Sequence, residues 1–215
     1  VVIDPRPGAG GNLGHDATAK APPDGYTLML ASTPFVLNPI LNAKVGYDTS
    51  RDFAPIALVA TLPNVLAVHP SVPAKSLREL VQLARANPGK LAYGSGTAGS
   101  TSHLAGELLR SLAKINILLV PYKGATFALV GAMSGEVDVV IPAASAVESY
   151  VKASRMRVLA VLDTRRLASM PDVPTSAEAG MPQLLIVNWY VLAAPAGTPR
   201  AIVERLNAEL TKILK

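Results

Sequence analysis

The strongest constraint on the fold is a series of short aliphatic runs that alternate with helical segments along the chain. The runs are unbroken, whereas a strand with one face in water alternates apolar and polar residues. Unbroken runs are typical of strands covered on both faces, which in a chain with intervening helices indicates parallel sheets of the α/β class. The predicted strands are Val1–Ile3, Tyr26–Leu30, Ile56–Val59, Val65–Val68, Ile117–Val120, Val137–Ile141, Val158–Leu162 and Val191–Ala194.

Helix signals separate these runs. Ser76 followed by Glu79 is a capping box, and the helix that it opens ends at the Asn87-Pro88-Gly89 turn. Thr198-Pro199 predicts the N-cap and first residue of a C-terminal helix. Further helices are predicted for Ser102–Leu112 and Ala125–Met133. With 215 residues, 50% of them hydrophobic, the chain can form one large α/β domain or two small ones.

Composition excludes several classes of function. The chain has no Cys, which excludes disulfides and thiolate chemistry, and its His residues, at positions 15, 69 and 103, are too scattered to predict a metal site. A formal net charge of +5 favours anionic ligands, but Lys and Arg form no long run, so nucleic acid is not an expected partner. No apolar run has the ~18 residues of a membrane span. Signatures of phosphate loops and nucleophile elbows are also absent, and no cofactor is predicted.

Two segments share one design. Residues 2–15 and 93–103 each combine a strand, a Gly-rich turn and an amphipathic helix, which suggests an internal pseudo-repeat. Glycine lets a backbone approach a ligand closely, and the N–H groups and dipole at a helix start favour an anion. A turn also needs glycine for purely structural reasons, so a structural and a ligand-binding interpretation both remain open.

A nucleotide-dependent, Rossmann-like enzyme is an alternative interpretation of the first segment. Gly8 and Gly10 match part of the dinucleotide fingerprint, but the third glycine is Gly14, one position later than the usual spacing. The next predicted strand is followed by Ala31-Ser32 and not by an acid that could bind a ribose. The match is therefore loose. A structural or sensory interaction module is a further alternative.

Six short sequence motifs, here called phrases, occur in the same order as in a known family. They are residues 23–28 (Pro-Asp-Gly-Tyr-Thr-Leu), 51–56, 93–95 with 99–107, 120–124 (Val-Pro-Tyr-Lys-Gly), 171–175 with 177–180, and 194–199. Together with residues 7–12 (Pro-Gly-Ala-Gly-Gly-Asn), these phrases cover essentially the whole chain. The chain resembles a solute-binding protein of the tripartite tricarboxylate transporter family, the Bug periplasmic receptors.

The resemblance implies a type II periplasmic binding protein fold, in which two α/β lobes enclose a ligand cleft. The first lobe would comprise residues 1–62 and 192–215, and the second residues 63–191. The resemblance further implies a periplasmic receptor without catalytic residues. Its ligand would be a di- or tricarboxylate or a similar organic acid, and its partners would be the membrane permease subunits of the transporter.

Site residues follow from the same resemblance. In the second Gly-rich segment, backbone and hydroxyl donors would clamp a carboxylate, directly or through water. The first lobe would add contacts to the ligand just after a strand, and residues near 122 would line the rim of the ligand cleft. His103, beside the turn, is either a ligand contact or a capping residue. The candidate ligand-binding residues are Ser32, Thr33, Gly94, Ser95, Gly96, Ser100, Thr101, His103, Tyr122 and Lys123.

The sequence departs from the family pattern at three places. Ile141-Pro142-Ala143 stands where many relatives carry Phe-Asp-Asn, which argues against an amino-acid ligand. The chain begins inside a predicted strand without Met or a signal peptide, and it lacks the family's first strand and Pro-Gly-Gly turn as well as its last helical segment. We therefore expect the 215-residue chain to bind carboxylates poorly and to self-associate through an exposed strand edge.

Overall fold

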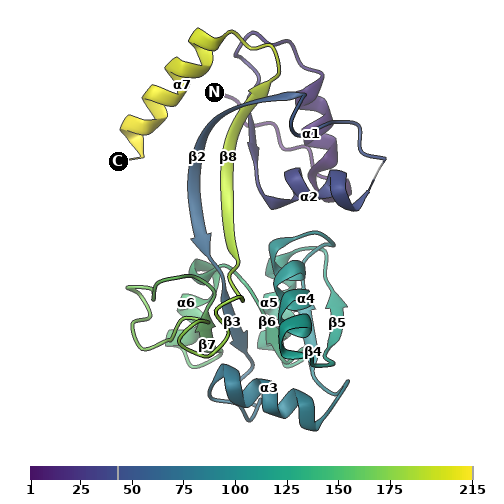
Figure 1. Cartoon of the computed structure of the whole chain (residues 1–215), viewed down its shortest axis with the longest axis vertical. Coiled ribbons are helices and arrows are strands. Elements are labelled where there is room, and N and C mark those ends of the chain that lie inside the picture. Colours follow the sequence, from purple (N-terminus) through teal and green to yellow (C-terminus); the bar gives the residue numbers. More distant parts are fainter. Residues whose placement is uncertain (43, 215) are drawn as a thin grey trace. The chain divides into compact units, whose positions relative to one another are not determined.

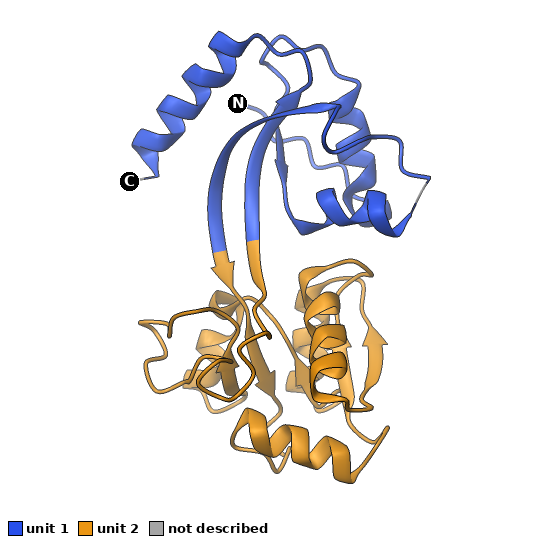
Figure 2. Ribbon diagram, viewed as in Figure 1, with its two compact units in different colours: residues 1–61, 189–215 blue, residues 62–188 orange. Residues whose placement is uncertain are grey.

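The computed structural model describes residues 1–42 and 44–214, which form two compact units. The first unit comprises Val1–Thr61 and Trp189–Lys215, and the second comprises Leu62–Asn188 (Figure 2). The sequence-based lobe boundaries, at 62/63 and 191/192, fall in the same two strands as these boundaries, β2 (Phe53–Pro63) and β8 (Val187–Pro195).

The first unit is built on a three-stranded sheet with the strand order β1-β8-β2. The short strand β1 (Met29–Ala31) pairs antiparallel with β8, so that Met29 lies opposite Ala193. Its helices are the 3-10 turn η1 (Ala9–Gly11), α1 (Asn12–Ala19), α2 (Thr33–Leu41) and α7 (Arg200–Ile213) (Figure 1). The core is small and aromatic: the rings of Phe35 and Phe53 meet edge to face at 4.8 Å between centroids.

Several predictions for this unit are wrong. Val1–Ile3 forms no strand: its side chains are exposed and nothing in the described residues pairs with it, because an aliphatic run becomes a strand only beside a partner. The sequence missed α2, whose Pro34 occupies the first turn, where proline is tolerated. The C-terminal helix begins at Arg200, with Pro199 as its N-cap.

The second unit contains a five-stranded sheet with the order β5-β4-β6-β3-β7. The strands are β3 (Val65–Val68), β4 (Ala92–Ser95), β5 (Leu118–Pro121), β6 (Val139–Val140) and β7 (Arg157–Val161). Strand β4 runs parallel to β5 and β6, whereas β3 runs antiparallel to β6 and β7. The prediction of purely parallel sheets is therefore wrong, because an unbroken aliphatic run reports burial on both faces and not strand direction.

Helices cover both faces of this sheet. They are α3 (Leu77–Ala86), α4 (Thr101–Ala113), α5 (Ala125–Met133) and α6 (Ala144–Lys152) (Figure 1). Successive residues of β3 alternate between two cores: Leu66 and Val68 pack in one cluster with Leu77 and Leu109. Val65 and Ala67 pack in the other, with residues of α5 and α6. This two-sided burial explains why the strand contains no polar residue.

Ser76 caps α3 as predicted, but the return bond from Glu79 goes to the residue before the N-cap. The Glu79 N–H donates to Ser76 Oγ at 3.1 Å, and the Glu79 carboxylate accepts from the backbone of Lys75 at 2.7 Å. Helix α5 has the predicted bounds, and α4 differs from its prediction by single residues. The strand expected at the start of residues 93–103 is β4, although it is absent from the predicted aliphatic strands, and the sequence missed helix α6. In β4, Gly94 and Ser95 interrupt the aliphatic pattern.

Candidate functional site

The second Gly-rich segment leads from β4 into α4. Gly94 and Ser95 are the last residues of β4, and α4 begins at Thr101, so residues 96–100 form the connecting turn. Ser95 is fully buried, and its carbonyl accepts a hydrogen bond from the Tyr122 N–H at 2.9 Å. This bond joins the end of β4 to the segment after β5. The carboxyl ends of two parallel strands therefore meet at the edge where α/β sheets place ligands.

The turn is held by its own hydroxyl groups. Gly96 donates its N–H to Ser102 Oγ at 2.9 Å, and that oxygen lies 3.1 Å from Ser100 Oγ. Ser100 also caps α4, because its Oγ accepts from the His103 N–H at 3.3 Å. The Ser100 N–H in turn donates to the Thr97 carbonyl at 3.0 Å. The N–H groups of Gly96 and Ser100 are therefore engaged within the turn.

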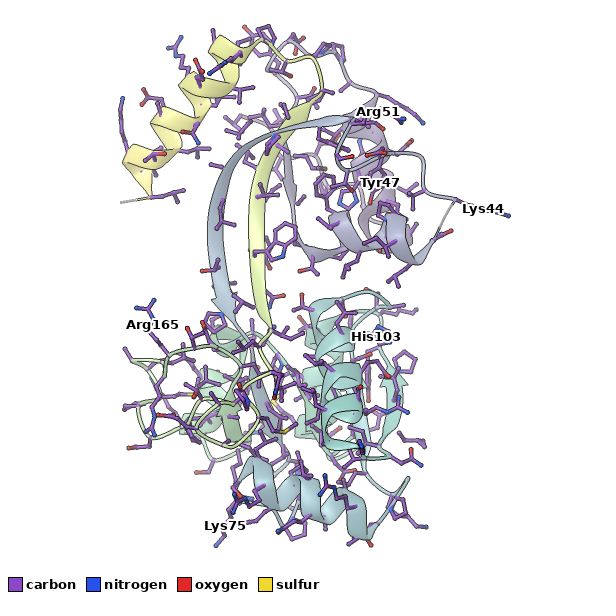
Figure 3. The ribbon with its side chains drawn as sticks, viewed as in Figure 1. Lys44, Tyr47, Arg51, Lys75, His103 and Arg165 are labelled. Atoms are coloured by element: carbon purple, nitrogen blue, oxygen red, sulfur yellow. The ribbon has the colours of Figure 1, made fainter. Side chains whose placement is uncertain are left out.

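His103 supports the same turn. Figure 3 shows it on the first turn of α4, and its Nδ1 accepts a hydrogen bond from the Gly99 N–H at 3.2 Å. The side chain is half-buried. Of the two roles considered for this residue, the contacts within the chain show the capping one.

The start of α5 provides a second set of donors that the sequence-based list of site residues lacked. Its N-cap is Gly124, in extended backbone and without a side chain that could cap the helix. The first N–H groups of a helix have no intrahelical acceptor. A Cβ placed on Gly96 would lie 3.3 Å from the Ala125 nitrogen and 3.1 Å from Ser100 Oγ. The starts of α4 and α5 thus both lie against Gly96, whose close neighbours are hydroxyl and amide groups.

The signal for this second helix start was present in the sequence. Gly124 ends the Val-Pro-Tyr-Lys-Gly phrase and directly precedes an apolar helix, which is the same arrangement of glycine and helix that marks the first turn. The sequence-based site includes Tyr122 and Lys123 of this phrase but not the backbone N–H groups that follow Gly124.

Tyr122 and Gly94 have structural contacts. The Tyr122 ring packs against the cluster of α5 and α6, its hydroxyl lies close to Gly131, and burial raises the pKa of this hydroxyl, with a smaller contribution from Glu136. A Cβ on Gly94 would meet Val137 Cγ2 at 2.9 Å, so glycine is needed there for packing. Lys123 is exposed.

Ser32 and Thr33 belong to the first unit and directly follow β1, as expected. Ser32 is the N-cap of α2, where its carbonyl accepts from the Phe35 N–H at 2.8 Å, and Thr33 is the first helical residue. Both side chains are partly exposed. The structure therefore confirms their place at the carboxyl end of a strand, and their contact with a ligand stays a prediction.

The first Gly-rich turn is fixed by a buried polar network. Asn38 Nδ2 donates to the Gly10 carbonyl at 3.1 Å and to Asn12 Oδ1 at 2.7 Å, and His15 Nδ1 lies 3.0 Å from the Tyr47 hydroxyl (Figure 3 labels Tyr47). Burial lowers the pKa of His15 and raises the pKa of Tyr47 to about 12. Positive φ angles at Gly10 (66°) and Gly11 require glycine. These contacts favour the structural interpretation of this turn.

Among residues 1–42 and 44–214, no group of three or more His, Cys, Asp or Glu side chains could hold a metal ion. Within the same ranges, no helix has the length and apolar character to cross a membrane.

Comparison with known proteins gives consistent matches over the chain. A model of the family described as tripartite tricarboxylate transporter family receptor matches residues 1–215. A protein from the tcbD-tcbE intergenic region of a Pseudomonas species is 41% identical over 215 residues, which are 100% of this chain and 64% of that protein. The protein BugT of Bordetella pertussis is 37% identical, over 100% of this chain and 67% of its own. The chain therefore spans about two thirds of the length of these relatives.

Solved structures agree with these matches. An R. palustris protein with adipate superposes with a TM-score of 0.90 at 37% identity, over 97% of this chain and 70% of its own. The protein MatC from Rhodopseudomonas palustris, with bound malate, has a TM-score of 0.84 at 31% identity, over 95% of this chain and 70% of its own.

Proposed function

Because this chain belongs to the tripartite tricarboxylate transporter receptor family, we propose that it is a periplasmic solute-binding receptor that captures a small carboxylate for uptake. Its fold is that of the periplasmic binding proteins. The adipate and malate in two similar structures support an organic acid as the ligand. The partners would be the membrane permease subunits of a tripartite tricarboxylate transporter, and no residue is assigned a catalytic role.

The observation that supports carboxylate binding is the meeting of two helix starts at Gly96. An anion there faces the positive ends of two helix dipoles and, at the start of α5, the first backbone N–H groups of a helix whose N-cap has no side chain. Hydrogen bonds to a charged acceptor contribute about 1.5 to 3 kcal/mol each, so two or three of them suffice for specific capture without a salt bridge.

The residues around Gly96 would have different roles in binding the carboxylate. The N–H groups of Ala125 and Thr126 would donate to one carboxylate, and the Ser100 hydroxyl would donate beside them. Gly96 would leave the Ala125 N–H accessible to this carboxylate, because a side chain at Gly96 would crowd the Ala125 nitrogen. Ser95 is buried within the fold and would act by positioning Gly96. Contacts by Thr101, His103, Lys123, Ser32 and Thr33 stay predictions.

Differential scanning calorimetry with several ligands tests the function. Adipate or malate at one hundred times its Kd should stabilise the chain by about 2.7 kcal/mol, because a ligand that binds only the folded state raises its stability. The matched control is adipamide, which keeps the carbon chain and lacks the charge. Stabilisation by a dinucleotide, with none by the acids, would refute the receptor and favour the Rossmann-like enzyme.

Self-association is a separate proposal. The first unit has an apolar cavity of about 340 Å³, lined by side chains such as Phe35, Leu58 and Trp189, and Leu58 is 59% exposed. Exposed apolar surface and the free edges of a short sheet both favour contact with another copy.

A further inference from the structure

Apart from Thr126, helix α5 consists of apolar residues, yet only one of its faces is buried. Ala128, Leu129 and Ala132 pack into the core of the second unit. Phe127 and Val130 lie on the other side of the helix and are 60% and 54% exposed. A helix without a polar face is typically buried all round. Within the described residues, the outer face of α5 is therefore an apolar surface with no partner.

Phe127 lies beside the donors of the proposed site. Helical side chains lean toward the N-terminus of their helix, and a Cβ placed on Gly124 would lie 3.8 Å from Phe127 Cδ2. The ring therefore covers the N-cap of α5. Gly96 approaches the same first turn, at the Ala125 nitrogen. The aromatic ring and the amide donors thus border one another on a single helical turn.

This pairing of surfaces limits the ligands that fit. A carboxylate bound at the first turn of α5 places the atoms attached to it next to the Phe127 ring. Methylene groups or an aromatic ring at that position would remove apolar surface from water. A hydroxyl group there would lose hydrogen bonds to water without gaining a partner from the ring.

Resting on the proposed function, we propose that Phe127 is a specificity-determining residue that selects acids whose carboxylate is joined to an apolar chain or ring. Short or hydroxylated acids would bind through the same N–H groups without this contact. Covering roughly half of the exposed ring corresponds to about a tenfold gain in affinity for the acid with the apolar chain.

The test compares two monocarboxylates of equal charge, acetate and hexanoate, in the 215-residue chain. Titration is followed by NMR at the amides of Gly96, Ala125 and Thr126, which also detects weak binding. We expect hexanoate to bind about tenfold more tightly than acetate. Phe127→Ala should weaken hexanoate binding about tenfold and change acetate binding by less than twofold.

Two further variants serve as controls for Phe127→Ala. Val130→Ala removes an exposed apolar side chain from the next turn of the same helix and should leave both affinities unchanged. Phe127→Leu keeps an apolar side chain and should retain most of the preference. Since Phe127 is largely exposed, both variants at this position should fold, which circular dichroism checks.

The outcomes separate the two proposals. Equal affinities for acetate and hexanoate, or an equal loss in Phe127→Ala and Val130→Ala, would overturn the role of Phe127 and leave the receptor function standing. If no acid shifts the NMR signals of the Gly96, Ala125 and Thr126 amides at any concentration while the chain is folded, the proposed function itself is wrong. The proposed selectivity of Phe127 is then wrong as well.

Discussion

Replacing Gly96 with alanine tests the proposed site most directly. The new methyl group would lie 3.1 Å from Ser100 Oγ and 3.3 Å from both Ser102 Oγ and the Ala125 nitrogen. These distances are shorter than the ordinary separation of about 3.5 to 4.0 Å, so the neighbours must move by a few tenths of an ångström. Gly96 has no positive φ, and the alanine therefore adds no backbone strain.

The structure gives the size of the effects of Gly96→Ala on stability and on ligand binding. Crowding of this extent should lower the free energy of unfolding by about 1 kcal/mol, because two of the three neighbours are hydroxyl groups on short side chains. The methyl group would also lie against the Ala125 nitrogen and so hinder a carboxylate from reaching that N–H. Losing one charge-assisted hydrogen bond of about 1.5 to 3 kcal/mol weakens binding roughly 10- to 100-fold.

Isothermal titration calorimetry with adipate measures the affinity, and thermal unfolding shows that the variant is folded. Ser111→Ala is the matched control, because this exposed side chain lies near the other end of α4. A folded Gly96→Ala variant with the affinity of the unchanged chain would show that the carboxylate does not bind between the two helix starts.

Two other predictions concern the turns. Ser100→Ala removes the cap of α4 and should cost about 1 kcal/mol in a denaturant melt, whereas Ser111→Ala should stay within about 0.5 kcal/mol; equal effects would contradict the capping role. Burial lowers the pKa of His15 below its ordinary 6.5, so the folded chain resists protonation of this side chain. The contribution of neutral His15 to the free energy of unfolding is therefore complete above about pH 6.5 and is lost as the pH falls below it. The unfolding temperature should decline between pH 7.5 and 5.5 and do so less steeply in His15→Gln; parallel pH profiles would rule out this residue as the cause.

The sequence by itself determined that β3 is buried on both faces and where several helices begin. Continuous aliphatic runs identified β3, and the Ser76–Glu79 spacing identified the start of α3, since both depend on local chemistry. The phrases shared with the receptor family located the Gly94–Thr101 turn. Local pattern was insufficient for Val1–Ile3, which has the composition of a strand and no neighbour to pair with in the described residues.

Only the tertiary structure decided the direction of the strands and the donors of the site. A residue run that is buried on both faces has the same composition in parallel and antiparallel pairing, so β3 gave no sign of its direction. Likewise, no local pattern shows that Ser102 takes up the Gly96 N–H, or that the start of α5 lies beside Gly96. The first depends on the conformation of the whole turn and the second on a contact between residues distant in the chain, and hydrogen bonds within the fold determine which donors are left for a ligand.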